Sequence, residues 1–303
     1  MRHVVSVSLG SSQRDHAVEA EFLGEKFLIE RIGTDGDLDK AETLIKKMDG
    51  KVDAFGMGGI DLYLVAGKRR YVVRDARRLA QAAQKSPIVD GSGLKSTLER
   101  RVIRQLSDSA MVPLAGKRAL LVSGVDRWGM AEGLTSAGCN LTCGDIIFAL
   151  GLPIPLRSLA KLKLAAALIA PIVVRLPFTM LYPTGKKQDV QKADPRFARY
   201  YLENDIIAGD FLFIKRHLPP EIPAKIIITN TVTSSDVKDL KKRGAAVLVT
   251  TTPEFNGRSF GTNVMEAVLV SLAGKPWAQL TSADYEDLLD KMNLKPRIMI
   301  LNQ

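Results

Sequence analysis

The chain has 303 residues, of which 46% are hydrophobic and 25% are charged, and its formal net charge at pH 7 is +10. These proportions are typical of a globular protein, exclude a disordered chain, and leave room for two domains that each have a core. The two cysteines and three histidines fit neither a disulfide framework nor a zinc site, so we expect no metal.

The first 115 residues alternate between strand-like apolar runs and helix-like segments. This alternation predicts an N-terminal α/β domain over residues 1–115, to which we assign substrate binding. A linker-like Pro-Leu-Ala-Gly stretch closes it. The predicted elements are strands over 4–9, 26–32, 52–56 and 71–73, and helices over 38–48, 76–84 and 95–106.

Residues 117–145 follow the order strand, glycine turn, helix, strand and acidic residue with which a dinucleotide-binding fold begins. Gly124 permits the tight turn, and Gly129 lets the amides of the next helix approach a pyrophosphate. Asp145 follows Gly124 by 21 residues, close to the ~20-residue offset of an acid that binds the adenine ribose. This acid favours NAD over NADP, whereas Arg127 suits a 2′-phosphate and leaves NADP open.

The glycine motif is incomplete, because Gly-Val-Asp-Arg-Trp-Gly keeps only the first and last glycines of GxGxxG. Asp126 stands where the middle glycine belongs, and its carboxylate repels a diphosphate unless Arg127 turns inward to offset it. We include both residues in the predicted cofactor site. The alternative is an ordinary strand–helix–strand unit that binds no cofactor.

Residues 164–174 are wholly apolar, but this run has 11 residues, whereas a membrane-spanning helix needs ~20. The run predicts a core strand over 167–174, after a helix over 156–163. A helix at a membrane interface is the alternative, although we expect no membrane partner.

A second strand–helix–strand unit has strands over 225–229 and 246–249 and a helix over 234–242, which favours a parallel sheet. We therefore predict a Rossmann-like NAD(P)-binding domain over 116–275. The segment 276–303 is expected to pack back on the N-terminal domain. The predicted fold is α/β with two domains.

The loop before an apolar helix over 264–273 contains Arg258, Ser259 and Asn263. These side chains and the free amides of the helix predict an anion-binding pocket for a small substrate. Thr262 or Asn263 is the expected cap of the helix. A capped connection without a ligand is the alternative.

Residues 88–97 bring an acid, a glycine turn, a lysine and hydroxyls to the start of a helix. Oxidation of an alcohol needs a general base, and Lys95, Asp90 or Asp75 could serve if burial tuned its pKa. The alternatives are an exposed first-turn lysine for Lys95 and a helix cap for Asp75. The spacing of a P-loop is not met, which argues against phosphate transfer.

The N-terminal α/β domain, the turn at Gly124 and the Ile-Ile-Thr-Asn-Thr-Val-Thr stretch of residues 227–233 together resemble the quinate and shikimate dehydrogenase family. The chain is more distantly similar to glutamyl-tRNA reductase. The resemblance implies that Ser6 and Ser8 bind a substrate carboxylate. The residues that it implies beside the dinucleotide are Asn230, Thr231 and Thr233, with Thr251 after the next strand. The lysine and aspartate motifs of the family are absent.

The leading hypothesis is an NAD(P)-dependent oxidoreductase that transfers hydride to or from a small anionic, quinate- or shikimate-like hydroxy acid in a cleft between the domains. The missing lysine and aspartate motifs motivate the alternative, a non-catalytic dinucleotide- or anion-binding sensor or scaffold on the same fold. The lack of a signal-peptide core and the reduced cysteines predict a cytoplasmic location. Basic residues are spread along the chain, so nucleic acid is not an expected partner, and a homodimer is the assembly we consider.

Overall fold

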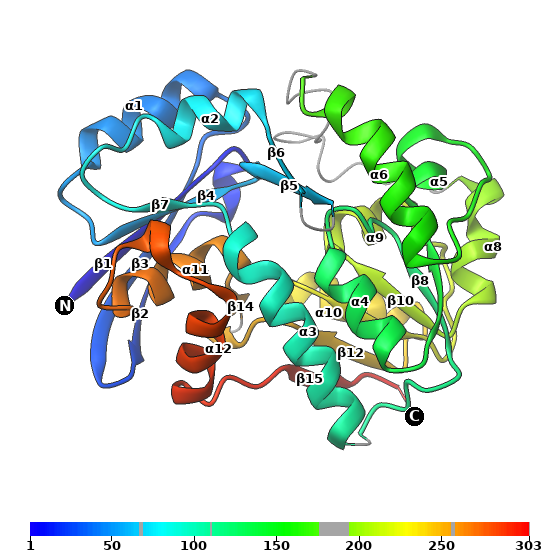
Figure 1. Ribbon diagram of the computed structural model, residues 1–303. Helices are drawn as coiled ribbons and strands as arrows, with labels where there is room; N and C mark the ends of the chain where they lie inside the picture. Colours follow the sequence, from blue (N-terminus) through cyan, green and yellow to red (C-terminus); the bar gives the residue numbers. More distant parts are fainter. Residues whose placement is uncertain (67–68, 110, 176–193, 256–257, 303) are drawn as a thin grey trace. The chain divides into compact units, whose positions relative to one another are not determined.

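A computed structural model describes residues 1–66, 69–109, 111–175, 194–255 and 258–302 (Figure 1). The chain forms two compact units, each assembled from separate stretches of sequence. Unit 1 comprises Met1–Thr97, Ile169–Asp189 and Gly261–Leu294, and unit 2 comprises Leu98–Leu168, Val190–Phe260 and Lys295–Gln303. The units differ from the predicted division, because residues 261–275 belong to unit 1 and the last residues of the chain belong to unit 2.

Unit 1 contains a five-stranded sheet in the order β2-β3-β1-β4-β7. Strands β3, β1, β4 and β7 run parallel to one another, and β2 pairs antiparallel with β3 at the edge of the sheet. β1 is buried along most of its length, as expected for a parallel strand that is covered on both faces. The strands are β1 (Arg2–Ser8), β2 (His16–Phe22), β3 (Glu25–Gly33), β4 (Ala54–Gly58) and β7 (Ile88–Val89), with a separate antiparallel pair, β5 (Tyr63–Ala66) and β6 (Arg69–Val72).

The core of unit 1 is formed by apolar side chains of the sheet and of two helices, among them Val5, Ile45, Phe55 and Leu79. The helices of this unit are η1 (Ser12–Arg14), α1 (Leu38–Met48), α2 (Arg74–Ala80), α11 (Thr262–Leu272), η3 (Trp277–Gln279) and α12 (Ser282–Lys291).

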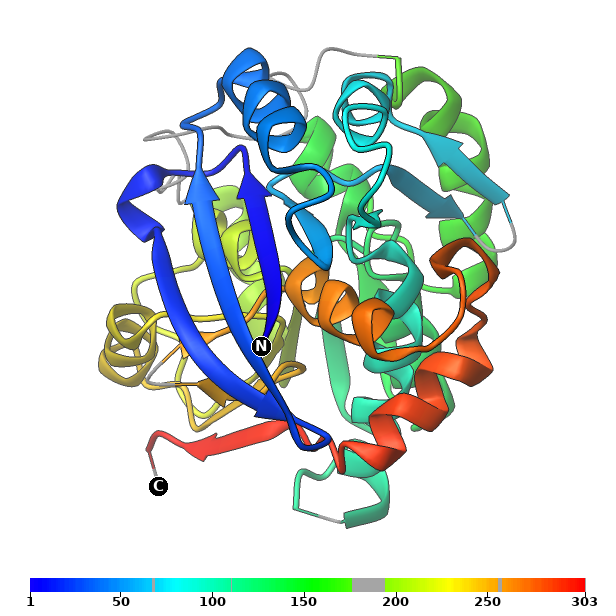
Figure 2. The same ribbon diagram turned by 90° about the vertical axis from the view of Figure 1, so that its left-hand side faces the viewer.

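Helix α11, orange in Figure 2, packs against β1 and β4, and two glycines allow its close approach. A Cβ at Gly56 in β4 would lie 3.0 Å from the carbonyl oxygen of Asn263. A Cβ at Gly91, where φ is +94°, would lie 2.8 Å from the backbone nitrogen of the same residue. Gly56 in β4 and Gly91 after β7 therefore allow the close packing of α11.

Unit 2 contains a six-stranded sheet in the order β15-β12-β11-β10-β8-β9. All strands except β15 are parallel, and in chain order they have the 2-1-3-4-5 arrangement of a doubly wound fold. This sheet confirms the predicted α/β fold. The strands are β8 (Arg118–Leu121), β9 (Asn140–Cys143), β10 (Ile206–Gly209), β11 (Ile226–Thr229), β12 (Val247–Thr250) and β15 (Arg297–Ile300), with a separate pair, β13 (Glu254–Phe255) and β14 (Arg258–Ser259).

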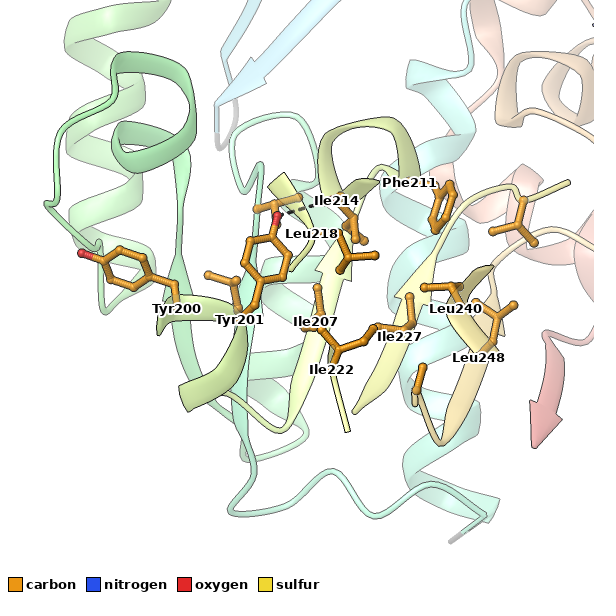
Figure 3. Packing of buried hydrophobic residues seen from close by; sticks show 14 of the residues in the cluster. Tyr200, Tyr201, Ile207, Phe211, Ile214, Leu218, Ile222, Ile227, Leu240 and Leu248 are labelled. Carbon is orange, nitrogen blue, oxygen red and sulfur yellow. Dashed lines mark hydrogen bonds between the residues drawn. The ribbon is translucent and has the colours of Figure 1, made fainter. Parts of the chain in front are cut away.

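Figure 3 shows the core of unit 2, in which Ile207, Ile227 and Leu248 from three adjacent strands pack together. The buried hydroxyl of Tyr201 donates a hydrogen bond of 3.1 Å to the carbonyl oxygen of Ile214, so this polar group does not remain unsatisfied. The helices are α3 (Ser92–Ser109), which begins in unit 1, α4 (Trp128–Ser136), α5 (Asp145–Leu150), α6 (Leu159–Val173), which ends in unit 1, α8 (Pro195–Glu203), α9 (Phe211–His217) and α10 (Ser234–Lys242).

The strand predicted over 167–174 is wrong, because these residues continue helix α6 as far as Val173. The helix is rich in leucine, alanine and lysine, which favour helix, and its β-branched residues are few. A continuous apolar run does not by itself distinguish a buried strand from a helix. No helix among the described residues is long and apolar enough to cross a membrane.

The predicted cap of α11 is also wrong. Gly261 is the N-cap residue and makes no side-chain cap hydrogen bond, and Thr262 is already helical. The side chain of Asn263 is used elsewhere, as described below.

Candidate functional site

The strand order of the unit 2 sheet reverses between β8 and β10, with β9 on the far side of β8. In doubly wound sheets the carboxyl ends of the strands at such a reversal form the ligand-binding edge. The residues that meet at this edge are Gly124 to Arg127 after β8, Asp145 after β9, Asp210 after β10 and Asn230 after β11. Together with Glu99 from α3, which contacts them, we call these residues the switch-point site.

Arg127 lies at the centre of the switch-point site and only 6% of its side chain is exposed. Its guanidinium forms ion pairs with Glu99 at 3.0 Å, Asp126 at 3.1 Å and Asp210 at 2.8 Å. The guanidinium of Arg127 therefore points inward and pairs with Asp126 among other carboxylates. Three carboxylates around one guanidinium leave the group with negative charge, which disfavours an anion at this place.

Asp210 joins the ends of three strands. One of its carboxylate oxygens accepts from Arg127 and, at 2.7 Å, from the side-chain amide of Asn230. The other caps α9 by accepting from the N–H of Leu212. The amide oxygen of Asn230 accepts from the N–H of Phe211 at 3.2 Å. Predicted residues Arg127 and Asn230 are thus brought together, but through Asp210, which the sequence analysis did not identify.

Asp145 contacts the glycine turn itself. Its carboxylate accepts from the N–H of Gly124 at 3.0 Å and from the N–H of Val125 at 2.9 Å. Burial raises the pKa of Asp145 to about 6, and the charge of Asp126 adds to this effect, while the two turn amides act against it. The predicted ribose acid is therefore correctly placed beside the turn. Its contact with a ribose stays a prediction, because here the carboxylate binds the turn.

The glycine turn is closely covered by other side chains of unit 2. A Cβ at Gly124 would lie 2.9 Å from Leu162 in α6 and 3.1 Å from the sulfur of Cys143. Gly124 is therefore required for the packing of α6, whether or not a cofactor binds. A substitution there disturbs the fold as well as any ligand.

The N-terminus of α4 is also occupied by the chain's own carboxylate. Glu99, which is 1% exposed, accepts from the N–H of Met130 at 3.0 Å while its other oxygen pairs with Arg127. Gly129 is buried in the first turn of this helix. Glu99 fills the role that a pyrophosphate has at such a helix N-terminus. Its sequence context, a charged stretch of a long helix, gives no sign of this role.

Of the predicted threonines, Thr233 caps α10 in a capping box with Asp236, and Thr251 is 1% exposed. The N–H of Thr251 donates to the carbonyl oxygen of Thr229, which links it to the end of the neighbouring strand. Thr231 is partly exposed beside Asn230. Thr231 and Thr233 are both partly exposed, and the hydroxyl of Thr233 is used in the cap of α10.

The predicted catalytic residues lie in unit 1. The ammonium of Lys95 pairs with Asp61 at 3.1 Å, and 10% of the lysine side chain is exposed. Asp90 is 7% exposed, and its carboxylate accepts from the backbone N–H of Leu62 and from both the N–H and the hydroxyl of Ser92. Lys95 is therefore not an exposed first-turn lysine, and Asp90 holds the loop after β4 to the start of α3.

Asp75 lies in the first turn of α2 and is partly exposed. Val73 is the N-cap residue of that helix, and no side chain caps it, so Asp75 is not a helix cap.

The predicted anion-binding residues fall into two groups. In unit 1, the side-chain amide of Asn263 donates to the hydroxyl of Ser6 at 2.9 Å. The hydroxyl of Ser8 accepts from the N–H of Gly10 and from Arg31. Residues Arg258 and Ser259 form β14 of unit 2, and Gly257 of the predicted loop lies outside the described residues.

Both cysteines are buried and free. Burial raises the pKa of the Cys139 thiol to about 11 and also raises that of Cys143. Buried thiols with a raised pKa are little reactive, so we interpret both cysteines as structural. No group of three or more His, Cys, Asp or Glu side chains within the described ranges could hold a metal ion.

The sequence model described as Domain of unknown function (DUF8754) matches residues 93–301. The chain belongs to the DUF8754 family. A second model, Domain of unknown function (DUF8753), matches residues 3–90. The two matches meet between β7 and α3, where Asp90 binds the helix start. No curated protein matches the chain.

Several solved structures are similar to this chain. A glutamate dehydrogenase from Thermus thermophilus is 11% identical, with 96% of this chain and 74% of that chain covered and a TM-score of 0.42. A malic enzyme from Entamoeba histolytica is 10% identical, with coverage of 90% and 58% and a TM-score of 0.40. A glucose-galactose binding protein from Geobacillus stearothermophilus is 9% identical, with coverage of 99% and 97% and a TM-score of 0.38. All three TM-scores are below 0.5, so no argument rests on these likenesses.

Proposed function

We propose that unit 2 binds a nicotinamide dinucleotide at the switch-point site and that the chain is an NAD(P)-dependent oxidoreductase. One observation carries this proposal: Gly124, Arg127 and Asp145 lie where the order of a doubly wound parallel sheet reverses. The proposed substrate is a small anionic hydroxy acid of the quinate or shikimate type, which the sequence resemblance implies.

The residues of the switch-point site suit the ribose groups of a dinucleotide but repel its diphosphate. The oxygens of Asp145, Asp210 and Asn230 are acceptors for ribose hydroxyls. A diphosphate beside α4 would instead meet Glu99 and Asp126. Binding therefore requires Arg127 to exchange a carboxylate for a phosphate and Asp145 to release the turn. The bound nicotinamide would supply the hydride chemistry, and Lys95 in unit 1 is the proposed proton-transfer residue.

Calorimetric titration with NAD, NADH, NADP and NADPH tests this proposal. We expect saturable binding of one oxidised and reduced pair. Asp126→Asn should tighten it about fivefold, because roughly 1 kcal/mol of repulsion between a unit charge and a nearby diphosphate is removed. Glu203→Gln, which changes an exposed carboxylate of α8, is the matched control and should leave affinity unchanged. No binding of any of the four at millimolar concentration would refute the proposal.

The second candidate function is a non-catalytic sensor or scaffold on the same fold. It is favoured by Glu99 and Asp145, which occupy the amides that a pyrophosphate would use. Turnover distinguishes the two candidates. The oxidoreductase predicts absorbance change at 340 nm with a hydroxy acid of this class, and Lys95→Ala should lower kcat while dinucleotide affinity is retained. Dinucleotide binding without turnover of any such acid would favour the sensor.

A further inference from the structure

Helix α6 is apolar on two opposite faces. Leu162 and Ala166 are buried, and Leu162 lies beside Gly124. On the outer face, Leu164 is 63% and Leu168 is 66% exposed. A leucine-rich helix face is ordinarily covered by protein or by lipid. The exposed leucines of α6 are not covered by the described part of the chain.

Exposed apolar side chains are concentrated around this helix. Twelve large hydrophobic residues are exposed in the described part of the chain, and five of them lie between residues 150 and 168. We call these five residues, which come from the end of α5, the following loop and α6, the α5–α6 surface: Leu150, Leu152, Ile154, Leu164 and Leu168. Single exposed leucines need no explanation, but such a group marks an interaction site.

The charges of the same segment have one sign. Residues 146–175 contain four basic residues and no acidic residue. Arg157, Lys161 and Lys163 are exposed, and the two lysines alternate with the leucines of α6. Exposed leucines interspersed with exposed lysine and arginine residues are typical of a segment that binds an anionic lipid surface.

We propose that the α5–α6 surface docks on an anionic lipid bilayer, with α6 lying in the plane of the interface. The helix has 15 residues, which at 1.5 Å per residue is about 22 Å and too short to span a hydrocarbon core of ~30 Å. A second copy of the chain suits this surface less, because a two-fold contact would bring the same basic side chains together. This inference does not depend on the proposed oxidoreductase activity.

Flotation of the full chain with vesicles tests the docking. The vesicles are pure phosphatidylcholine, or an equimolar mixture of phosphatidylcholine and phosphatidylglycerol. We expect binding to the mixed vesicles that weakens with salt. The double variant Leu164→Gln/Leu168→Gln should bind at least about tenfold more weakly, because it loses two leucine side chains that would be buried in the bilayer. Lys161→Glu/Lys163→Glu should also weaken binding by about tenfold or more.

Leu202→Gln is the matched control, since Leu202 is a 46% exposed leucine on α8 of the same unit. It should bind mixed vesicles as the unaltered chain does. Circular dichroism should show that all variants keep their helical content, which is expected because every substituted side chain is exposed. The proposal is overturned if the chain binds no vesicles at low salt, or binds both compositions equally. It is also overturned if the leucine variant only dissociates a dimer in size-exclusion chromatography, which would identify a protein interface.

Discussion

Glu266 of α11 has a buried carboxyl group that forms no ion pair with the described residues. It is 3% exposed, and one of its oxygens accepts from the hydroxyl of Tyr285 at 2.8 Å. The other oxygen has no hydrogen-bond partner among the described residues. Burial, with the nearby charge of Asp90, raises the pKa of Glu266 from 4.5 to about 8. The group is therefore mostly protonated at neutral pH.

This pKa makes the stability of the fold depend on pH. Between pH 4.5 and 8 the folded chain holds a proton on Glu266 that the unfolded chain releases, so this group's contribution falls as pH rises. The slope is about 1.4 kcal/mol per pH unit, which amounts to roughly 3 kcal/mol between pH 4.5 and pH 7. The contribution is fully present below pH 4.5 and lost above pH 8.

Glu266→Gln removes the titration while keeping the shape of the side chain. We expect its free energy of unfolding in urea, measured relative to the unaltered chain, to improve steadily from pH 5 to pH 8. A constant offset from the new amide does not affect this slope. Glu21→Gln, at an exposed carboxylate of β2, should show no such trend. Parallel pH profiles for Glu266→Gln and the unaltered chain would refute a protonated Glu266.

Three further predictions concern the switch-point site, all measured by urea unfolding. Arg127→Met should destabilise the fold by roughly 3–5 kcal/mol, since it leaves buried carboxylates unpaired, whereas Arg78→Met, at a surface pair, should leave stability nearly unchanged. Equal effects would contradict the network. Gly124→Ala should destabilise the fold by about 1–3 kcal/mol, because the added methyl group meets Leu162. When Gly124→Ala is combined with Leu162→Ala, the alanine at position 124 should therefore cost less stability. The free energy of unfolding of Asp145→Asn, relative to that of the unaltered chain, should rise between pH 4 and pH 6, because the pKa of Asp145 is raised to about 6. A difference in free energy that does not change over this range would indicate a carboxylate with an ordinary pKa.

Much of the fold follows from local sequence. The helices predicted over 38–48 and 234–242 have the observed bounds. Both carry a local start signal, because Asp37 and Thr233 accept from amides of the first turn. The edge strand β2 was not predicted. Its side chains are mostly partly or fully exposed, so no buried face marks it, and its pairing with β3 is set by the neighbouring strand.

The candidate site was predicted only where its residues lie close together along the chain. Spacing alone placed Gly124, Arg127 and Asp145 at one edge of a sheet. The partners that determine what Arg127 does, Glu99 and Asp210, are separated from it by 28 and 83 residues. No periodicity or motif links residues at such distances, because their contact exists only after the sheet has formed.

Sequence spacing and the contacts of the folded chain therefore determine different properties of the site. A glycine turn at the reversal of a parallel sheet marks where a ligand would bind, and the sequence contains this turn. The affinity for an anion depends on the charge that the fold gathers around the turn. Here the gathered charge is acidic: Asp145 binds the amides of the turn, and Glu99 binds the start of α4 and pairs with Arg127. A dinucleotide must compete with these internal contacts, so weak binding that strengthens when Asp126 is neutralised is the behaviour this site should have.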